Sequence, residues 1–204
     1  MEKPHQHEDN KVPVAMLIID VINDFNFPEA PLLLKTSAPI ADKILELKNR
    51  AKQEKIPIIY VNDNFGQWQS DKHKLVDYCT TQSGGEFVKK LQPDDDDFFV
   101  VKPKHSGFFS TPLSTLLNEL GIQTLVLCGV AGNICVLFTA NDAYMRGFTL
   151  FAPSDCSASN IEEDNERALI LMEKTLNADI SMSNDLNLRA IIDQAKENKH
   201  KMMY

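Results

Sequence analysis

The stretch VPVAMLIID at residues 12–20 is a continuous apolar run that ends in an acid. A run without polar alternation is typical of a β-strand that is covered on both faces. Similar runs follow at 56–63, 98–103, 122–129 and 147–155, and segments with helical spacing separate them. Strands that alternate with helices form a parallel sheet through right-handed crossovers, so this alternation constrains the fold more than any other feature.

The segments between the runs carry the capping residues of helices. Ser37 is predicted to cap a helix with Pro39 in its first turn. Thr111 is predicted to cap a short helix that has Pro112 at its first position and Gly121 at its end. Further helices are expected directly after Cys135, over 160–177 and over 183–197.

Two segments complete the predicted organisation. ADISM at 178–182 is predicted to be a short sixth strand, and 64–97 a long irregular segment of the kind that is often functional. The four aspartates at 94–97 are predicted to form a solvated turn. We therefore predict an α/β fold, a three-layer α-β-α arrangement with a mainly parallel six-stranded sheet. One domain is expected over 12–198, with frayed ends at 1–11 and 199–204.

The composition excludes several classes of partner. Lys and Arg number 21 and Asp and Glu number 29 in 204 residues, which gives a net charge of −8 and argues against nucleic acid or an anionic membrane surface. No apolar run reaches the roughly 18 residues of a membrane span, and the N-terminal segment is polar. The four cysteines show no paired spacing, so we expect reduced thiols in the cytoplasm.

Chemically capable side chains follow the ends of the predicted strands. The first strand ends at Asp20, the second at Asp63 and the third at Lys102, and the fourth leads through a turn of small residues to Cys135. Sheets of this kind bind ligands at the carboxyl ends of their strands. Each residue also has a purely structural interpretation, because an aspartate can cap a turn, a lysine can be a surface charge and a free cysteine is usually buried. Their joint placement favours a reactive site.

Three segments carry a resemblance to a known family. LIIDVINDF (17–25) resembles a first-strand motif with D-x-x-N-D-F, VVKPKHSGFFSTPL (100–113) resembles a lysine segment, and LVLCGVAGNICVLFTANDAYMRGF (125–148) resembles a nucleophile segment. Together they resemble the isochorismatase-like cysteine hydrolases, which include nicotinamidases, N-carbamoylsarcosine amidases and isochorismatases. The resemblance covers about residues 12–182.

The resemblance implies that Asp20, Lys102 and Cys135 form a catalytic triad. It also implies a cis peptide bond between Val130 and Ala131, with the backbone amides of Ala131 and Cys135 forming an oxyanion hole. The helix N-terminus and Lys102 are expected to lower the thiol pKa. The implied reaction is hydrolysis of a small amide, carbamoyl or related carbonyl substrate through a thioester on Cys135. No cofactor is expected, and the family implies a homo-oligomer, either a dimer or a tetramer.

The chain departs from the family pattern at two positions. Nicotinamidases have an Asp-x-His metal site after the second strand, but here Phe65 follows Asp63 at the expected histidine position, so no metal is predicted. A site based on His73 is the less favoured alternative. His105 stands where the family often has tyrosine. The substrate pocket is predicted to include Phe25, Asn64, Phe65, Trp68, His105 and Phe108.

Two other functions stay open at this point. True isochorismatases hydrolyse a vinyl ether by acid catalysis from the aspartate, without a nucleophilic cysteine. A non-catalytic scaffold that retains the fold is the other alternative. Cys135 favours the amidase-like reaction, and the intact set of three residues argues against a scaffold.

Overall fold

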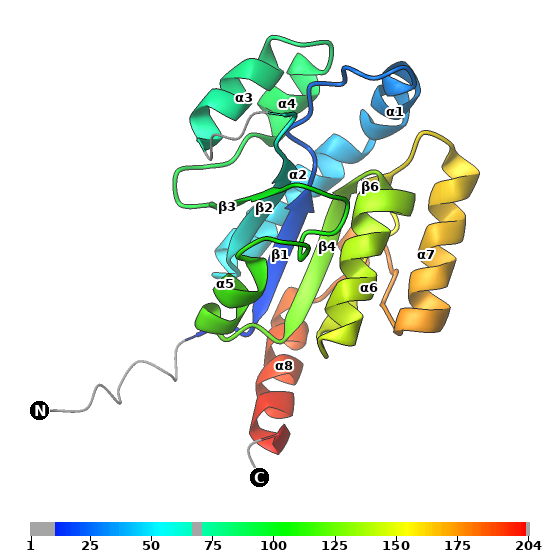
Figure 1. Ribbon diagram of the computed structural model, residues 1–204. Coiled ribbons are helices and arrows are strands. Elements are labelled where there is room, and N and C mark those ends of the chain that lie inside the picture. The colour runs from blue at the N-terminus through cyan, green and yellow to red at the C-terminus, as the bar shows by residue number, and fades with distance from the viewer. Residues whose placement is uncertain (1–10, 67–70, 203–204) are drawn as a thin grey trace, which may run out of the picture.

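A six-stranded sheet forms the middle of the molecule, with helices packed on both of its faces (Figure 1). The computed structural model describes residues 11–66 and 71–202. The strands follow the order β3-β2-β1-β4-β5, with β6 also beside β4, and every pair of neighbours is parallel. Their bounds are β1 (Val14–Ile19), β2 (Ile58–Asp63), β3 (Phe98–Lys102), β4 (Thr124–Val130), β5 (Thr149–Phe151) and β6 (Ser157–Ala158). The predicted three-layer α-β-α fold is confirmed.

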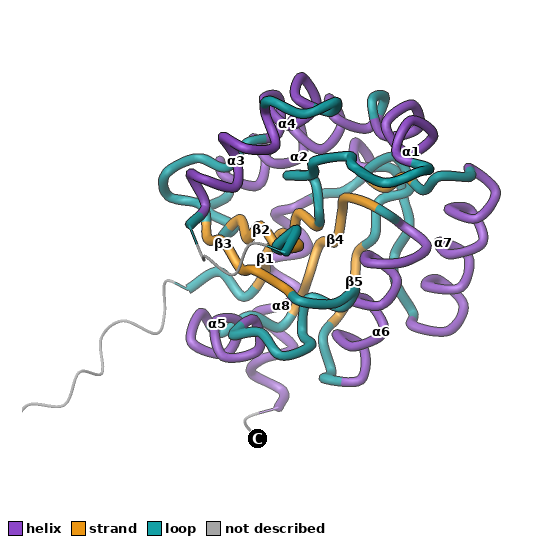
Figure 2. Tube along the Cα trace, turned by 45° about the horizontal axis from the view of Figure 1, so that its top comes forward, coloured by secondary structure: helices purple, strands orange, loops and turns teal. Residues whose placement is uncertain are grey.

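The helices divide between the two faces of the sheet (Figure 2). One face packs against α1 (Ala30–Ser37), α2 (Ile40–Gln53), α3 (Lys72–Thr80), α4 (Gly85–Leu91) and α8 (Leu188–Met202). The other face packs against α5 (Leu113–Leu120), the π-helix η1 (Gly132–Val136), α6 (Leu137–Met145) and α7 (Glu162–Leu176). A short 3-10 turn, η2 (Ser183–Asp185), precedes α8. Among the described residues, no helix has both the length and the apolar character that a membrane span requires.

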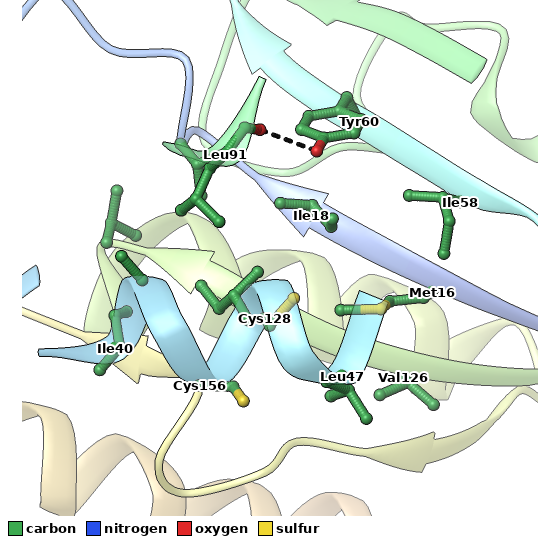
Figure 3. Packing of buried hydrophobic residues seen from close by; sticks show 14 of the residues in the cluster. Met16, Ile18, Ile40, Leu47, Ile58, Tyr60, Leu91, Val126, Cys128 and Cys156 are labelled. Atoms are coloured by element: carbon green, nitrogen blue, oxygen red, sulfur yellow. Dashed lines mark hydrogen bonds between the residues drawn. The ribbon is translucent and has the colours of Figure 1, made fainter. Parts of the chain in front are cut away.

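The apolar run that opens the chain explains these two layers. All six residues of β1 are fully buried, because Val14, Met16 and Ile18 belong to one core cluster while Ala15, Leu17 and Ile19 belong to the other. Figure 3 shows the first cluster, in which Met16 and Ile18 lie with residues of β2, β4 and α2. Tyr60 is also buried there, and its hydroxyl group donates to the carbonyl oxygen of Leu91 at 2.8 Å.

The predicted helix cap at Ser37 is wrong. Ser37 is the last residue of α1, and its hydroxyl group donates back to the carbonyl oxygen of Leu33, so it is satisfied inside that helix. The sequence analysis missed α1 altogether. The next helix begins after Pro39 without any side-chain cap. The predicted start of the helix at Pro112 is one residue early, since α5 begins at Leu113 with Pro112 at its N-cap. The hydroxyl group of Thr111 still accepts the amide of Leu113 at 3.2 Å.

The predicted sixth strand at 178–182 is also wrong. The chain there makes one isolated bridge, between Asp179 and Phe151, and then turns away because the Asp179 carboxylate accepts the amide of Ser181. The sixth strand is instead Ser157–Ala158, which pairs with Gly129 and Val130.

The segment 64–97 is not irregular, since it contains α3 and α4. The Asp71 carboxylate accepts the amides of His73 and Lys74 and so caps α3. Both helices contribute buried apolar side chains to the first core cluster, namely Leu75, Val76, Cys79, Phe87, Val88 and Leu91. The helix α8 extends to Met202, into the stretch predicted as the C-terminal end, and residues 1–10 of the predicted N-terminal end lie outside the described residues.

Close contact between β1 and β4 depends on Gly129. Its φ of +121° is one that side chains rarely permit, and a Cβ atom there would overlap the carbonyl oxygen of Ile19 on the neighbouring strand. Gly147 also has a positive φ, +82°, but a Cβ atom there would meet nothing within 4 Å.

We therefore predict that Gly129→Ala lowers the free energy of unfolding by about 3 kcal/mol or more. The added methyl group would overlap β1, and the residue would also have to adopt an unfavourable positive φ. Gly147→Ala should carry only the backbone cost, about 1–2 kcal/mol. Urea denaturation of the two variants tests the difference. Equal losses would show that the approach of β1 to β4 imposes no constraint.

Candidate active site

Asp20, Lys102 and Cys135 come together at the carboxyl edge of the sheet. Asp20 follows β1 directly, Lys102 is the last residue of β3, and Cys135 lies in η1 just after β4. In the strand order β3-β2-β1-β4, Lys102 lies two strands from Asp20, roughly 10 Å across the sheet at the usual strand spacing. Only a long side chain bridges that distance, which is why lysine fits this position.

The Lys102 ammonium group is the centre of the cluster. Its Nζ lies 2.7 Å from a carboxylate oxygen of Asp20, 3.6 Å from Sγ of Cys135 and 3.2 Å from the carbonyl oxygen of Lys104. These three partners use its three protons. The Lys102 side chain is 1% exposed and that of Asp20 is 7% exposed, so the ion pair is withdrawn from solvent. Cys135, whose sulfur contacts Lys102, is half-buried.

Backbone contacts hold Asp20 in a left-handed conformation. Its φ is +52°, which is uncommon for an aspartate. The backbone amide of Asp63, at the end of β2, donates to Oδ1 of Asp20 at 2.8 Å. The fully buried Asn62 accepts the amide of Ile22 and donates to its carbonyl oxygen, which anchors the chain just after Asp20. The sequence analysis missed Asn62, whose signal is a polar residue inside an apolar strand.

The electrostatics of the thiol differ from the expectation. Burial raises the pKa of the Cys135 thiol, the Asp20 carboxylate raises it further, and Lys102 opposes both effects. The predicted lowering of this pKa is therefore wrong, because one ammonium group does not outweigh burial and an adjacent carboxylate.

The two buried charges affect each other as well. Burial raises the pKa of the Asp20 carboxyl group, although Lys102 opposes the shift. Burial lowers the pKa of Lys102, but the negative charges of Asp20 and Cys135 more than compensate and the net shift is upward. A carboxylate with a raised pKa is a stronger base, and it lies beside a thiol that keeps its proton.

The turn before Cys135 is fixed by contacts at both ends. The Val130–Ala131 peptide bond is cis. The carbonyl oxygen of Ala131 accepts the amides of Ile134 and Val136, which winds the chain into η1. The amide of Asn133 donates to the hydroxyl group of Ser159 at 3.0 Å.

The turn also rests closely on α7. Ser159 donates in turn to the buried Asn165 of α7 at 3.1 Å. A Cβ atom at Gly132 would overlap that same Asn165 side chain, so only glycine fits there. Ser159 and Asn165 support the turn, and no sequence pattern indicated them. The oxyanion-hole role of the Ala131 and Cys135 amides stays a prediction.

Two of the predicted pocket residues lie in the core. Phe25 is 4% exposed and packs edge-on against Phe87, with ring centroids 5.8 Å apart. Phe108 is 5% exposed, and the guanidinium group of Arg146 lies over its ring at 4.7 Å. Their packing accounts for both residues without a substrate.

The other predicted pocket residues have different surroundings. Asn64 accepts the amide of Gly66, and Phe65 is half-buried against the first core cluster. Trp68 lies outside the described residues. Among the pocket residues that are described, His105 is the one brought to the thiol, with its Nδ1 3.9 Å from Sγ of Cys135.

Acidic residues gather away from this edge, in the turn before β3. Asp94, Asp96 and Asp97 form a group that could in principle hold a cation. Lys48 lies 2.7 Å from Asp97, and Lys52 contacts all three carboxylates. Asp97 is 6% exposed, so the prediction of a solvated turn is wrong for this residue. The two lysines pair with the three carboxylates and tie the turn to α2.

A parallel sheet with this polar edge defines the class of α/β proteins that bind small ligands at the carboxyl ends of their strands. A model of the isochorismatase domain matches residues 14–184, so the chain belongs to the isochorismatase family and is a hydrolase of that family. It is 48% identical over 172 residues to an uncharacterised isochorismatase family protein of Bacillus subtilis, covering 84% of this chain and 95% of that protein.

Solved structures agree with this assignment. The chain is 29% identical to an isochorismatase-like hydrolase from Alkaliphilus metalliredigens, with a TM-score of 0.68 over 84% of this chain and 95% of the other. It is 26% identical to the nicotinamidase from Staphylococcus aureus, with a TM-score of 0.66 over 84% of this chain and 99% of the other.

The buried ion pair yields a stability prediction. Asp20→Asn should lower the free energy of unfolding by about 3–5 kcal/mol, because it leaves the Lys102 ammonium group buried without its counter-charge. The double variant Asp20→Asn with Lys102→Met should recover most of this loss. Urea denaturation of the two single variants and the double variant measures the coupling. If the losses of the two single variants simply add up in the double variant, the two side chains are not energetically coupled.

The thiol yields a labelling prediction. Iodoacetamide should modify Cys135 first, because Cys79, Cys128 and Cys156 are buried. The rate should keep rising as the pH rises above 9, since the thiol pKa is raised and only the thiolate reacts. Lys102→Met should slow the labelling, because it removes the ammonium group that opposes the rise in the thiol pKa. Peptide mass mapping against pH, with Cys135→Ser as control, tests this, and equal labelling of a buried cysteine would contradict it.

Proposed function

We propose that this protein is a cysteine hydrolase that cleaves a small amide, carbamoyl or related carbonyl substrate through a thioester on Cys135. The observation that carries the proposal is the contact of one thiol with both a buried carboxylate and a buried ammonium group. A purely structural cysteine needs neither partner. The similarity to a nicotinamidase supports a substrate with a C–N bond.

The first half of the reaction forms the thioester. Asp20 takes the proton from the Cys135 thiol, and Sγ attacks the carbonyl carbon of the substrate. The developing negative charge on the carbonyl oxygen is stabilised by the backbone amides of Ala131 and Cys135. Lys102 holds Asp20 in place and keeps the cluster from accumulating negative charge. The C–N bond then breaks as Asp20 gives its proton to the leaving amine.

In the second half, Asp20 takes a proton from water as the water oxygen attacks the thioester carbon, and the C–S bond then breaks. The sulfur regains its proton from Asp20, and the acid product leaves. The cycle restores the thiol and the carboxylate. No step requires a redox or group-carrying cofactor, so the substrate and water are the only reactants.

Replacing the nucleophile and the base tests the proposal. Cys135→Ala should abolish hydrolysis of the best amide found in a panel of small amides and carbamoyl compounds. Asp20→Asn should fold but reduce turnover by ~100-fold or more, the usual scale for the loss of a general acid-base group. Phe109→Ala, a change at an exposed aromatic residue of the same segment, is the control and should keep turnover within about threefold.

Isochorismate belongs in the same panel. If Cys135→Ala keeps wild-type turnover on the best substrate, and that substrate is a vinyl ether, the covalent mechanism is wrong and acid catalysis by Asp20 replaces it. A chain that hydrolyses nothing in the panel and shows no preferential labelling of Cys135 would instead be a scaffold.

A further inference from the structure

A buried hydroxyl group links the nucleophile to the segment that carries Lys102. Thr139 lies in the first turn of α6 and is fully buried. Its Oγ1 donates to the carbonyl oxygen of Cys135 at 2.7 Å and accepts the backbone amide of Gly107 at 3.0 Å. Gly107 follows Lys102 by five positions in the chain. One side chain therefore joins the segment 102–107 directly to the residue that carries the thiol.

The sheet itself fixes Asp20 more closely than Lys102 relative to the thiol. The strand that precedes Asp20, β1, pairs directly with β4, which leads to Cys135. Lys102 ends β3, which pairs with β2, so two strands lie between it and β4. Its ammonium group nevertheless lies 3.6 Å from the sulfur, at the end of a side chain with several rotatable bonds. A contact outside the sheet is needed to hold the two groups together.

Further contacts show that the segment 102–107 has a defined position against α6. The Ser106 hydroxyl group donates to the Asp142 carboxylate of that helix. Within the segment, the carbonyl oxygen of Lys104 accepts a hydrogen bond from Nζ of Lys102 at 3.2 Å. The place of the ammonium group therefore depends on where the segment lies.

The hydrogen bonds of Thr139 go beyond those of an ordinary helical threonine. A threonine in a helix often donates to the carbonyl oxygen four residues earlier, with no further role. Here the same hydroxyl group also accepts the amide of Gly107, which is 32 residues away in the chain and buried. The carbonyl oxygen to which it donates belongs to Cys135, in the π-helix η1. Without the hydroxyl group, the buried Gly107 amide would lose this partner.

We propose that Thr139 is a positioning residue that holds the segment 102–107 against Cys135 and thereby sets the contact between the Lys102 ammonium group and the sulfur. This proposal rests on the proposed function.

Loss of the Thr139 hydroxyl group should affect the charged groups around the thiol unequally. The ionisable groups that face the thiol are Asp20, Lys102 and His105. Without the hydroxyl group, Lys102 should withdraw from the sulfur, whereas Asp20 should stay because the paired strands hold it. The thiolate would then lose part of its stabilising attraction and keep the unfavourable carboxylate.

Iodoacetamide labelling of Cys135 tests this consequence without a substrate. Thr139→Val keeps the volume of the side chain but removes the hydroxyl group, and should slow labelling near about pH 8 by about three- to tenfold. Thr139→Ser keeps the hydroxyl group and should label within about twofold of wild type. Both changes should lower the free energy of unfolding, the first through the Gly107 amide and the second through the missing methyl group. Urea denaturation of both variants shows whether the labelling rate follows the hydroxyl group or the stability.

A second background shows whether Thr139 acts through the lysine. In the double variant Asp20→Asn with Lys102→Met, the ammonium group beside the sulfur is gone. Adding Thr139→Val to it should therefore change the labelling rate by less than about twofold. Thr80→Val is the matched control and should label like wild type. It removes a hydroxyl group that donates to a carbonyl oxygen of its own helix, that of Asp77 in α3, at 2.8 Å.

Three results would overturn the role of Thr139. They are labelling of Thr139→Val at the wild-type rate, equal slowing in Thr139→Ser, and slowing by Thr139→Val that persists in the double-variant background. Failure of the proposed function is recognised separately, because it appears as hydrolysis of an amide by Cys135→Ala at the wild-type rate, which labelling does not measure.

Discussion

The ion pair between Asp20 and Lys102 is the interaction on which the rest of the site depends. It joins the ends of β1 and β3 across β2, at 2.7 Å and almost out of contact with solvent. A buried ion pair adds little stability, because the free energy lost when the two charges leave water equals or exceeds the free energy gained from their attraction. Their retention at the carboxyl edge of the sheet is explained by the half-buried thiol that contacts both, since a base and a counter-charge are what a nucleophilic cysteine requires.

The apolar sheet holds this polar cluster rigidly. Gly129 lets β4 approach β1, Asn62 fixes the chain after Asp20, and Gly132 lets η1 lie directly on Asn165 of α7. Each of these positions is determined by a close approach of backbone to its surroundings. Substitution of any one of these three residues would move a reacting group relative to the others, and small displacements of that kind strongly reduce the catalytic rate.

The thiol has two different sides. On the buried side, burial and the Asp20 carboxylate raise the pKa of the Cys135 thiol, and the Lys102 ammonium group opposes this shift. On the exposed side, Nδ1 of His105 lies 3.9 Å from the sulfur, and the two residues that follow His105 are hydrogen-bonded to α6.

The sequence by itself determined the alternation of strands and helices, the parallel sheet and the placing of Asp20, Lys102 and Cys135 at one edge, because these depend on hydrophobic periodicity and on where strands end. Only the tertiary structure decided the rest. The helices α3 and α4 are defined by the burial of their apolar side chains in the first core cluster, and the places of Phe25 and Phe108 by core packing that no local pattern reports. The direction of the thiol pKa was misjudged for the same reason: it depends on how completely Cys135 is desolvated and how near Asp20 lies, which are distances between segments more than 100 residues apart in the chain.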